Sequence, residues 1–180
     1  WDLTVPRSGL FAGTTLLRFL KSYFGEKEFH HLELPFACTG TDIETGEEVV
    51  LREGRVAEAI RASCGIPLLF VPYHHQGRFL VDGGLVDPVP TKVVSQLGAD
   101  ILIAVNLTVP ARQRRTALRD RSQKRLLSVE RIAQMGPLKE LAIKEMLEAP
   151  HVLEILFQMI YTMEFEIAAS RMDLNHVVIQ

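Results

Sequence analysis

Apolar residues that recur every three or four positions predict the helices of this chain. The clearest pattern covers Thr14–Phe24, where Leu16, Leu17 and Leu20 share one face and glycines at 13 and 25 mark the two ends. The same periodicity predicts three further helices, at Arg55–Ser63, at Thr91–Leu97 and from Pro150 to near Met172.

Shorter apolar runs bounded by turn residues predict strands between these helices. Pro35–Ile43 and Val49–Leu51 flank the turn sequence Glu44–Glu47 and predict a β-hairpin. A second, shorter hairpin is predicted from Leu69–Tyr73 and Arg78–Val81, with a tip at His74–Gly77, and His176–Ile179 predicts a last strand.

One strand pattern differs from the others and indicates the fold class. Asp100–Leu107 is a nearly continuous apolar run, which is typical of a strand covered on both faces in a parallel sheet. Together with the helices, it predicts an α/β fold with a mostly parallel central sheet flanked by helices. We expect this fold to be incomplete at the N-terminus and at the C-terminus, where the last strand stops in mid-element.

Composition narrows the class of protein. The 180 residues, 47% hydrophobic, are enough for one globular domain with a real core. A formal net charge of −2 gives no reason to expect nucleic acid as a partner. No apolar run is long enough to span a membrane, and Cys38 and Cys64 lie in neither a disulfide nor a zinc pattern, so we expect no metal and no cofactor.

One segment departs from this balance. Residues 111–149 form a basic helical segment whose first part is strongly positive, and two interpretations stay open: a solvated helix face, or a patch that contacts an anionic membrane surface or a partner. The residues that would make this contact are Arg112, Arg114, Arg115, Arg119, Arg121, Lys124 and Arg125.

The stretch Arg78–Pro90 holds the main candidate for chemistry. An apolar, β-rich run ends in Asp82, and Gly83 and Gly84 then allow a sharp turn with no side chain to block the approach of another group. A strand that closes in Asp-Gly-Gly is first of all a turn signal, but a carboxylate presented in this way can also act as a base.

The other candidates are weaker on pattern. The adjacent pairs His30–His31 and His74–His75 should point in different directions and make no ligand set. Asp42, just before a turn, is expected to organise local hydrogen bonds. No serine has the G-x-S-x-G context of a nucleophile, and Ser63 and Cys64 are expected to end a helix.

Four motifs in this order resemble the patatin-like phospholipases, in particular the bacterial branch related to the neuropathy target esterase domain. They are Gly9–Gly13 with the helix after it, Leu34–Glu47, Ala59–Pro67 and Leu80–Pro90. The resemblance extends to the helix Pro150–Arg171 and the closing Val177–Ile179, and it leaves out about residues 112–149. The ordered series is far more specific than any single motif.

The resemblance implies a lipid acyl hydrolase. In this family the Asp-Gly-Gly carboxylate acts as the base of a serine–aspartate dyad without histidine, and that role transfers to Asp82, with Gly83 and Gly84 supporting the turn. The expected substrate is a phospholipid, a lysophospholipid or another acyl ester, which is hydrolysed through an acyl-enzyme intermediate.

The nucleophilic half of this site is not in the sequence. The family's glycine-rich oxyanion segment and its G-x-S-x-G elbow lie upstream of every matched motif, and neither occurs in residues 1–180. We therefore expect a single, partial catalytic domain that is inactive by itself. The alternative is a non-catalytic module that binds a membrane or a partner. The expected location is the cytoplasm, with peripheral membrane contact; an N-terminal targeting signal cannot be read from a chain that opens on Trp1.

Overall fold

The computed structural model describes residue 2 and residues 8–108, 152–171 and 177–179. By its contacts the chain divides into two compact units, residues 1–106 with 167–180, and residues 107–166. The basic segment predicted at 111–149 lies entirely outside the described residues. The single-domain interpretation and the membrane patch therefore stay predictions. Everything described below, except the first part of the last helix, belongs to the first unit.

A four-stranded sheet forms the centre of this unit, in the order β2-β1-β4-β3. The strands are β1 (Cys38–Asp42), β2 (Glu48–Leu51), β3 (Tyr73–His75) and β4 (Arg78–Asp82). Strands β1 and β2 are the predicted first hairpin, and β4 lies between β1 and β3. The sheet thus places the end of β4, where Asp82 stands, next to the middle of β1.

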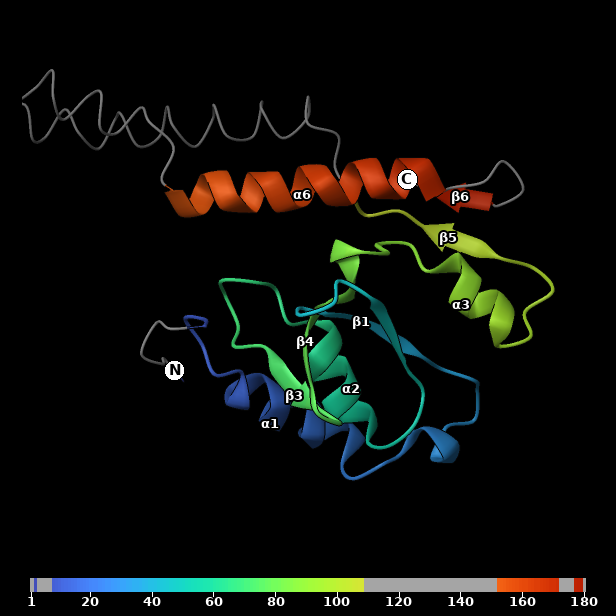
Figure 1. The fold of residues 1–180 in the computed structure, drawn as a ribbon. Helices are drawn as coiled ribbons and strands as arrows, with labels where there is room; N and C mark the ends of the chain where they lie inside the picture. The colour runs from blue at the N-terminus through green and yellow to red at the C-terminus, as the bar shows by residue number, and fades with distance from the viewer. Residues whose placement is uncertain (1, 3–7, 109–151, 172–176, 180) are drawn as a thin grey trace, which may run out of the picture. The chain divides into compact units, whose positions relative to one another are not determined.

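Two helices complete the layers of this unit. Helix α2 (Val56–Ser63) packs on β1 and β4, and α1 (Thr14–Phe24) packs against α2 (Figure 1). Both helices end within a residue of the predicted bounds. The core between α2 and the sheet contains Val56 and Leu80, both fully buried, and each such side chain contributes about 1.5–3 kcal/mol to the free energy of folding.

The remaining elements lie downstream of the sheet. A 3₁₀ turn η2 (Gly83–Leu85) leads to α3 (Thr91–Gln96) and then to β5 (Ile103–Val105), which pairs in parallel with β6 (Val177–Ile179). Between them in sequence, helix α6 covers Val152–Arg171. None of the described helices combines the length and the apolar character that crossing a membrane requires.

The predicted α/β class is confirmed, but the strand directions differ from the prediction. In the four-stranded sheet every pairing is antiparallel: β1–β2 and β3–β4 are hairpins whose short turns reverse the chain, and β1 and β4 join the two hairpins in the same sense. The parallel geometry that the apolar run at 100–107 indicated occurs in the pair β5–β6 alone among the described strands.

The coverage of β5 also differs from the prediction. Ala104 is buried in a small cluster with Val89 and Ala168, but Ile103 and Val105 on the opposite face are more than half exposed. The strand is therefore covered on one face only in the described part of the chain. The strand carries apolar residues on both faces, and for this reason the sequence pattern alone predicted that both faces would be covered.

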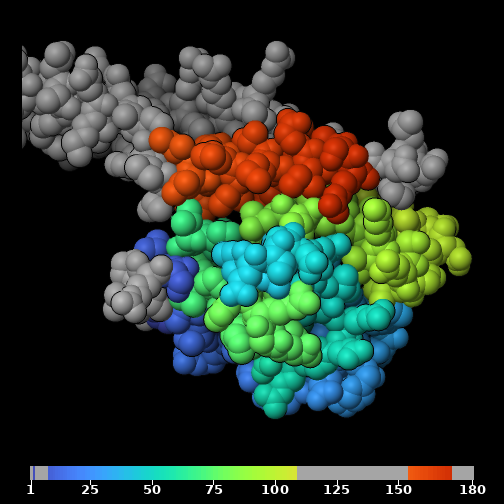
Figure 2. Space-filling view, viewed as in Figure 1, coloured from blue at the N-terminus to red at the C-terminus, as the bar shows by residue number. Residues whose placement is uncertain are grey.

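The second hairpin is tighter than predicted. Its turn consists of Gln76 and Gly77, both with positive φ, so His74 and His75 pair with residues of β4 instead of forming the tip. The two hairpins lie side by side, cyan beside green in Figure 2, as the pairing of β1 with β4 requires. Arg78 of β4 also pairs with Asp42 and Glu47 of the first hairpin.

Candidate active site

Asp82 stands at the point where β4 ends, and its backbone is held on two sides. Its N–H donates to the carbonyl of Gly65 just beyond α2 (3.0 Å), and its carbonyl accepts a hydrogen bond from Thr41 Oγ1 on β1 (2.8 Å). In the sheet register Asp82 lies opposite Gly40. The apolar strand and these two hydrogen bonds fix the backbone of Asp82 and therefore the position of its Cβ.

The Asp82 carboxylate is half-buried and has few partners. Its Oδ1 accepts a hydrogen bond from the N–H of Gly84 (2.8 Å), and among the described residues no cation pairs with it. Burial raises the pKa of the Asp82 carboxyl above its ordinary value, and the Gly84 hydrogen bond opposes this only in part. A carboxylate with a raised pKa and a free oxygen is a better proton acceptor than one in water.

The two glycines have distinct parts in this turn. A Cβ at position 83 would overlap the carbonyl oxygen and the Oγ1 of Thr39, so only glycine fits where the chain crosses β1. Gly84 supplies the N–H that orients the carboxylate. The structure thus brings all three residues of the predicted site, Asp82, Gly83 and Gly84, into one short turn.

Cys64 is a neighbour that the sequence did not connect to this site. It is the C-terminal cap of α2, as expected, and its residue surface is exposed although the thiol is partly shielded from water. Partial burial raises the pKa of its thiol, and the negative charge of Asp82 raises it further. The thiol therefore stays neutral near the carboxylate and is a poor nucleophile.

Arg61 is the second feature that the sequence analysis missed. Its guanidinium is 2% exposed and donates to three backbone carbonyls, those of Ala12 (3.0 Å), Gly13 (3.2 Å) and Val71 (3.0 Å). Its Nη1 has no hydrogen-bond partner. The only signal in the sequence was an arginine four residues after Ala57, on a helix face of small residues.

Arg61 joins the chain just before α1 to the segment that follows Gly65. The carbonyls it holds belong to the start of α1 and to the chain that follows Gly65, and the guanidinium also lies over the rings of Phe70 and Tyr73. The carbonyl of Gly65, four residues after Arg61, accepts a hydrogen bond from the N–H of Asp82, so the backbone connects this arrangement to the candidate base.

The weaker candidates have structural roles. Asp42 Oδ1 accepts from the N–H of Glu44, which confirms it as an organiser of the turn. His31 Nδ1 accepts from the N–H of Glu28, and the rings of His30 and His31 lie 3.9 Å apart, so the expectation that this pair diverges was wrong. The 3₁₀ turn that contains the pair brings the two rings together. Among the described residues no group of side chains could hold a metal ion.

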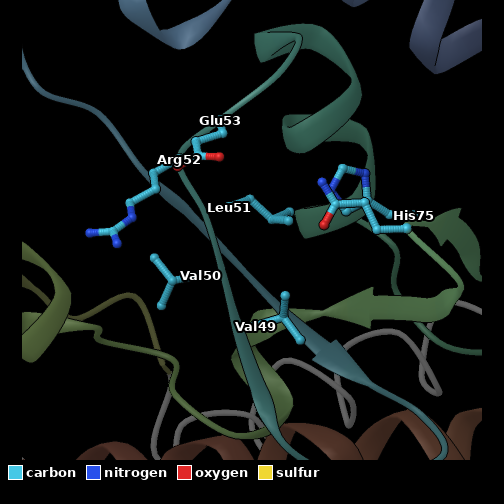
Figure 3. A pocket seen from close by; sticks show the side chains of 7 residues that line it. Val49, Val50, Leu51, Arg52, Glu53 and His75 are labelled. Carbon is cyan, nitrogen blue, oxygen red and sulfur yellow. The ribbon is translucent and has the colours of Figure 1, made fainter.

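A shallow pocket of about 210 Å³ lies away from these groups, along β2 and beside the turn of the second hairpin (Figure 3). It does not include Asp82 or its turn. The residues that line it are Val49, Val50, Leu51, Arg52, Glu53, His75 and Gln76.

Comparison with known proteins identifies relatives of this chain. The family model described as patatin-like phospholipase matches residues 1–95. An uncharacterized NTE family protein of Mycobacterium bovis is 32% identical over 106 residues, which are 59% of this chain and 29% of the relative. A second such protein, from Mycobacterium tuberculosis, is 38% identical over 93 residues, 52% of this chain and 16% of the relative.

A more distant relative has a more specific name. The lysophospholipase NTE1 of Phaeosphaeria nodorum is 29% identical over 106 residues, 59% of this chain and 7% of the relative. The chain thus spans less than a third of the length of each of these curated relatives.

Proposed function

Because the chain belongs to the patatin-like phospholipase family, we propose that it is the part of a serine lipid acyl hydrolase that carries the general base, Asp82. The observation that supports this role most directly is the carboxylate itself, which is half-buried, has a raised pKa and is oriented by the N–H of Gly84. In this proposal the nucleophilic serine lies outside residues 1–180, since no serine here has the required context.

The reaction needs two proton transfers at Asp82. The carboxylate accepts the serine proton as the serine oxygen attacks the ester carbonyl carbon, and the proton then passes to the alcohol that leaves. In the second half, Asp82 accepts a proton from water as the water oxygen attacks the acyl-enzyme carbonyl. The serine–carbonyl bond then breaks, the fatty acid is released, and the proton returns to the serine.

The substrate class follows from the family and from one relative's name. A phospholipid, a lysophospholipid or a simple acyl ester fits both, and the lysophospholipase among the relatives favours a single-chain lipid. No cofactor is needed for this chemistry, because the base and the nucleophile are side chains.

The test replaces the carboxylate while keeping its shape. In the natural protein that contains this chain, Asp82→Asn should lower kcat for a short p-nitrophenyl ester by about 10²–10⁴-fold, which is the usual contribution of a general base. The control is Asp100→Asn, which removes an exposed carboxylate outside the turn and should leave kcat unchanged. A wild-type rate in Asp82→Asn would disprove the proposal, and residues 1–180 alone should give no turnover.

The alternative, a non-catalytic module that contacts an anionic membrane from the cytoplasm, concerns residues outside the described ranges. It depends on the basic segment whose cations begin at Arg112 and end at Arg125. Flotation with vesicles of phosphatidylcholine, with and without phosphatidylserine, tests it. Equal flotation with both vesicles would remove the membrane contact.

A further inference from the structure

A buried ion pair lies just downstream of the candidate base. The side chain of Asp87 is 4% exposed, and its Oδ2 lies 2.9 Å from Nη1 of Arg171 at the end of α6. Its other oxygen, Oδ1, is buried without a hydrogen-bond partner. A buried carboxylate is stable only with a partner, so Arg171 is what allows a charged Asp87 at this place.

Asp87 is tied to the turn of Asp82 through the backbone. The N–H of Asp87 donates to the carbonyl of Gly83 (2.9 Å), and so does the N–H of Val86 (3.1 Å). The N–H of Gly84, which belongs to the same peptide group as the Gly83 carbonyl, orients the Asp82 carboxylate. The direction of that carboxylate is therefore set by a turn whose far end is held by the Asp87 side chain.

The same end of α6 packs against the chain that follows this turn. Ala168, three residues before Arg171, is fully buried with Val89 and Ala104. The charged neighbours of the ion pair are Glu48 and Lys92. Burial raises the pKa of Glu48, the charge of Asp87 adds to this, and Arg171 and then Lys92 oppose it. Apolar contact and ion pair together fix the helix end to the turn.

We propose that Arg171 is a positioning residue for Asp82, which acts by holding the buried carboxylate of Asp87 and, through it, the turn Gly83–Asp87. This inference rests on the proposed function, because it assigns Asp82 the part of the base. Arg171 itself touches no reacting atom in this proposal.

The test is Arg171→Met in the natural protein, with Arg55→Met as the matched control. Arg55 Nε also lies 2.9 Å from a carboxylate oxygen, that of Glu26, but neither side chain of that pair is buried, whereas Asp87 is. In Arg171→Met we expect amide hydrogen exchange at Val86 and Asp87 to quicken, and kcat to fall about tenfold with KM changed less than twofold. Arg171→Lys should restore most of kcat.

The pH profile separates positioning from a general loss of structure. A loosened turn admits water to Asp82, and because burial is the main cause of the raised pKa of this carboxyl, that pKa should fall. The acid limb of kcat/KM then moves to lower pH in Arg171→Met and stays in place in Arg55→Met. If Arg171→Met does not fold, the double variant Asp87→Asn, Arg171→Met, which leaves no buried charge unpaired, should show the same losses.

The outcomes are distinct. If exchange quickens but kcat and the acid limb match Arg55→Met, Arg171 is only structural and the inference is overturned. If the wild-type protein hydrolyses no ester, the proposed function fails by itself. The positioning claim is then decided by the Asp82 carboxyl pKa from ¹³C NMR, which should fall in Arg171→Met; an unchanged pKa would overturn it.

Discussion

Two buried charged side chains flank Asp82 in the sequence, and they are stabilised in different ways. Upstream, Arg61 is 2% exposed and donates only to backbone carbonyls, and within the described part of the chain it forms no direct ion pair with a carboxylate. Downstream, Asp87 is 4% exposed and pairs with Arg171, whose own side chain is 43% exposed.

This difference between Arg61 and the pair Asp87–Arg171 indicates where a substitution is better tolerated. The planar guanidinium of Arg61 matches three fixed carbonyls, so no shorter or differently shaped donor can replace it. Arg171 meets its partner with one contact and keeps access to water, so a lysine can take its place, although its removal would leave Asp87 buried without a partner. We therefore expect the upstream side to be rigid and the downstream side to be adjustable.

The largest effect is expected from Arg61→Met. The substitution leaves the carbonyls of Ala12, Gly13 and Val71 without a charged donor, and we expect a loss of about 4 kcal/mol in the free energy of unfolding, measured by denaturant titration. Arg61→Lys should recover less than half of this loss, because an ammonium cannot reproduce the fork. The comparison fails if lysine recovers as large a share of the lost free energy of unfolding at position 61 as it does at position 171.

Much of the fold could be predicted from sequence periodicity. The bounds of α1 and α2 and the first hairpin follow from local patterns, since glycines and turn residues mark their ends. The pairing of β1 with β4, which joins the two predicted hairpins into one antiparallel sheet, and the cover of β5 on one face only could not be predicted. Both depend on which segments meet in space, and an apolar strand has the same composition whether one or two faces are covered.

The candidate site divides in the same way. Asp82, Gly83 and Gly84 are contiguous, so a motif could identify them, although their catalytic role stays a prediction. Arg61 and Arg171 have partners far away in the sequence, at Gly13 and Asp87. An arginine on an amphipathic helix is usually at the surface, so nothing in the pattern marks these two as parts of the site.

An effect of intermediate size is expected at Gly83, which lies between Arg61 and Asp87 in the sequence. In Gly83→Ala the new Cβ would overlap Thr39, so the backbone must shift. We expect this shift to lower the free energy of unfolding by about 2 kcal/mol. The control is Gly98→Ala. Gly98 has φ +93° but open space around it, so this variant should lose only about 1 kcal/mol from its left-handed backbone. Equal losses in the two variants would show that the turn yields without strain.

The smallest effect concerns Asp82 itself, and its sign is opposite to that of the other two. Burial raises the folded-state pKa of this carboxyl above the unfolded value of 3.8, so its ionisation favours the unfolded state. Below pH 3.8 the carboxyl is protonated in both states and nothing is lost. As the pH rises from there through the folded-state pKa, the wild type loses stability, and the loss stays constant at higher pH.

Asp82→Asn removes this loss, so the variant should be slightly more stable than the wild type at pH 7 and lose that advantage near pH 3, although it should be inactive. Asp2→Asn supplies the opposite case. The N–H of Thr15 lowers the pKa of Asp2, so its ionisation stabilises the fold, and this stability disappears as the pH falls through the lowered value. Thermal unfolding of the three proteins between pH 3 and pH 7 distinguishes the cases. If Asp82→Asn were less stable than the wild type at pH 7, the carboxylate would stabilise the fold. The argument for a base held in a destabilised charged form would then fail.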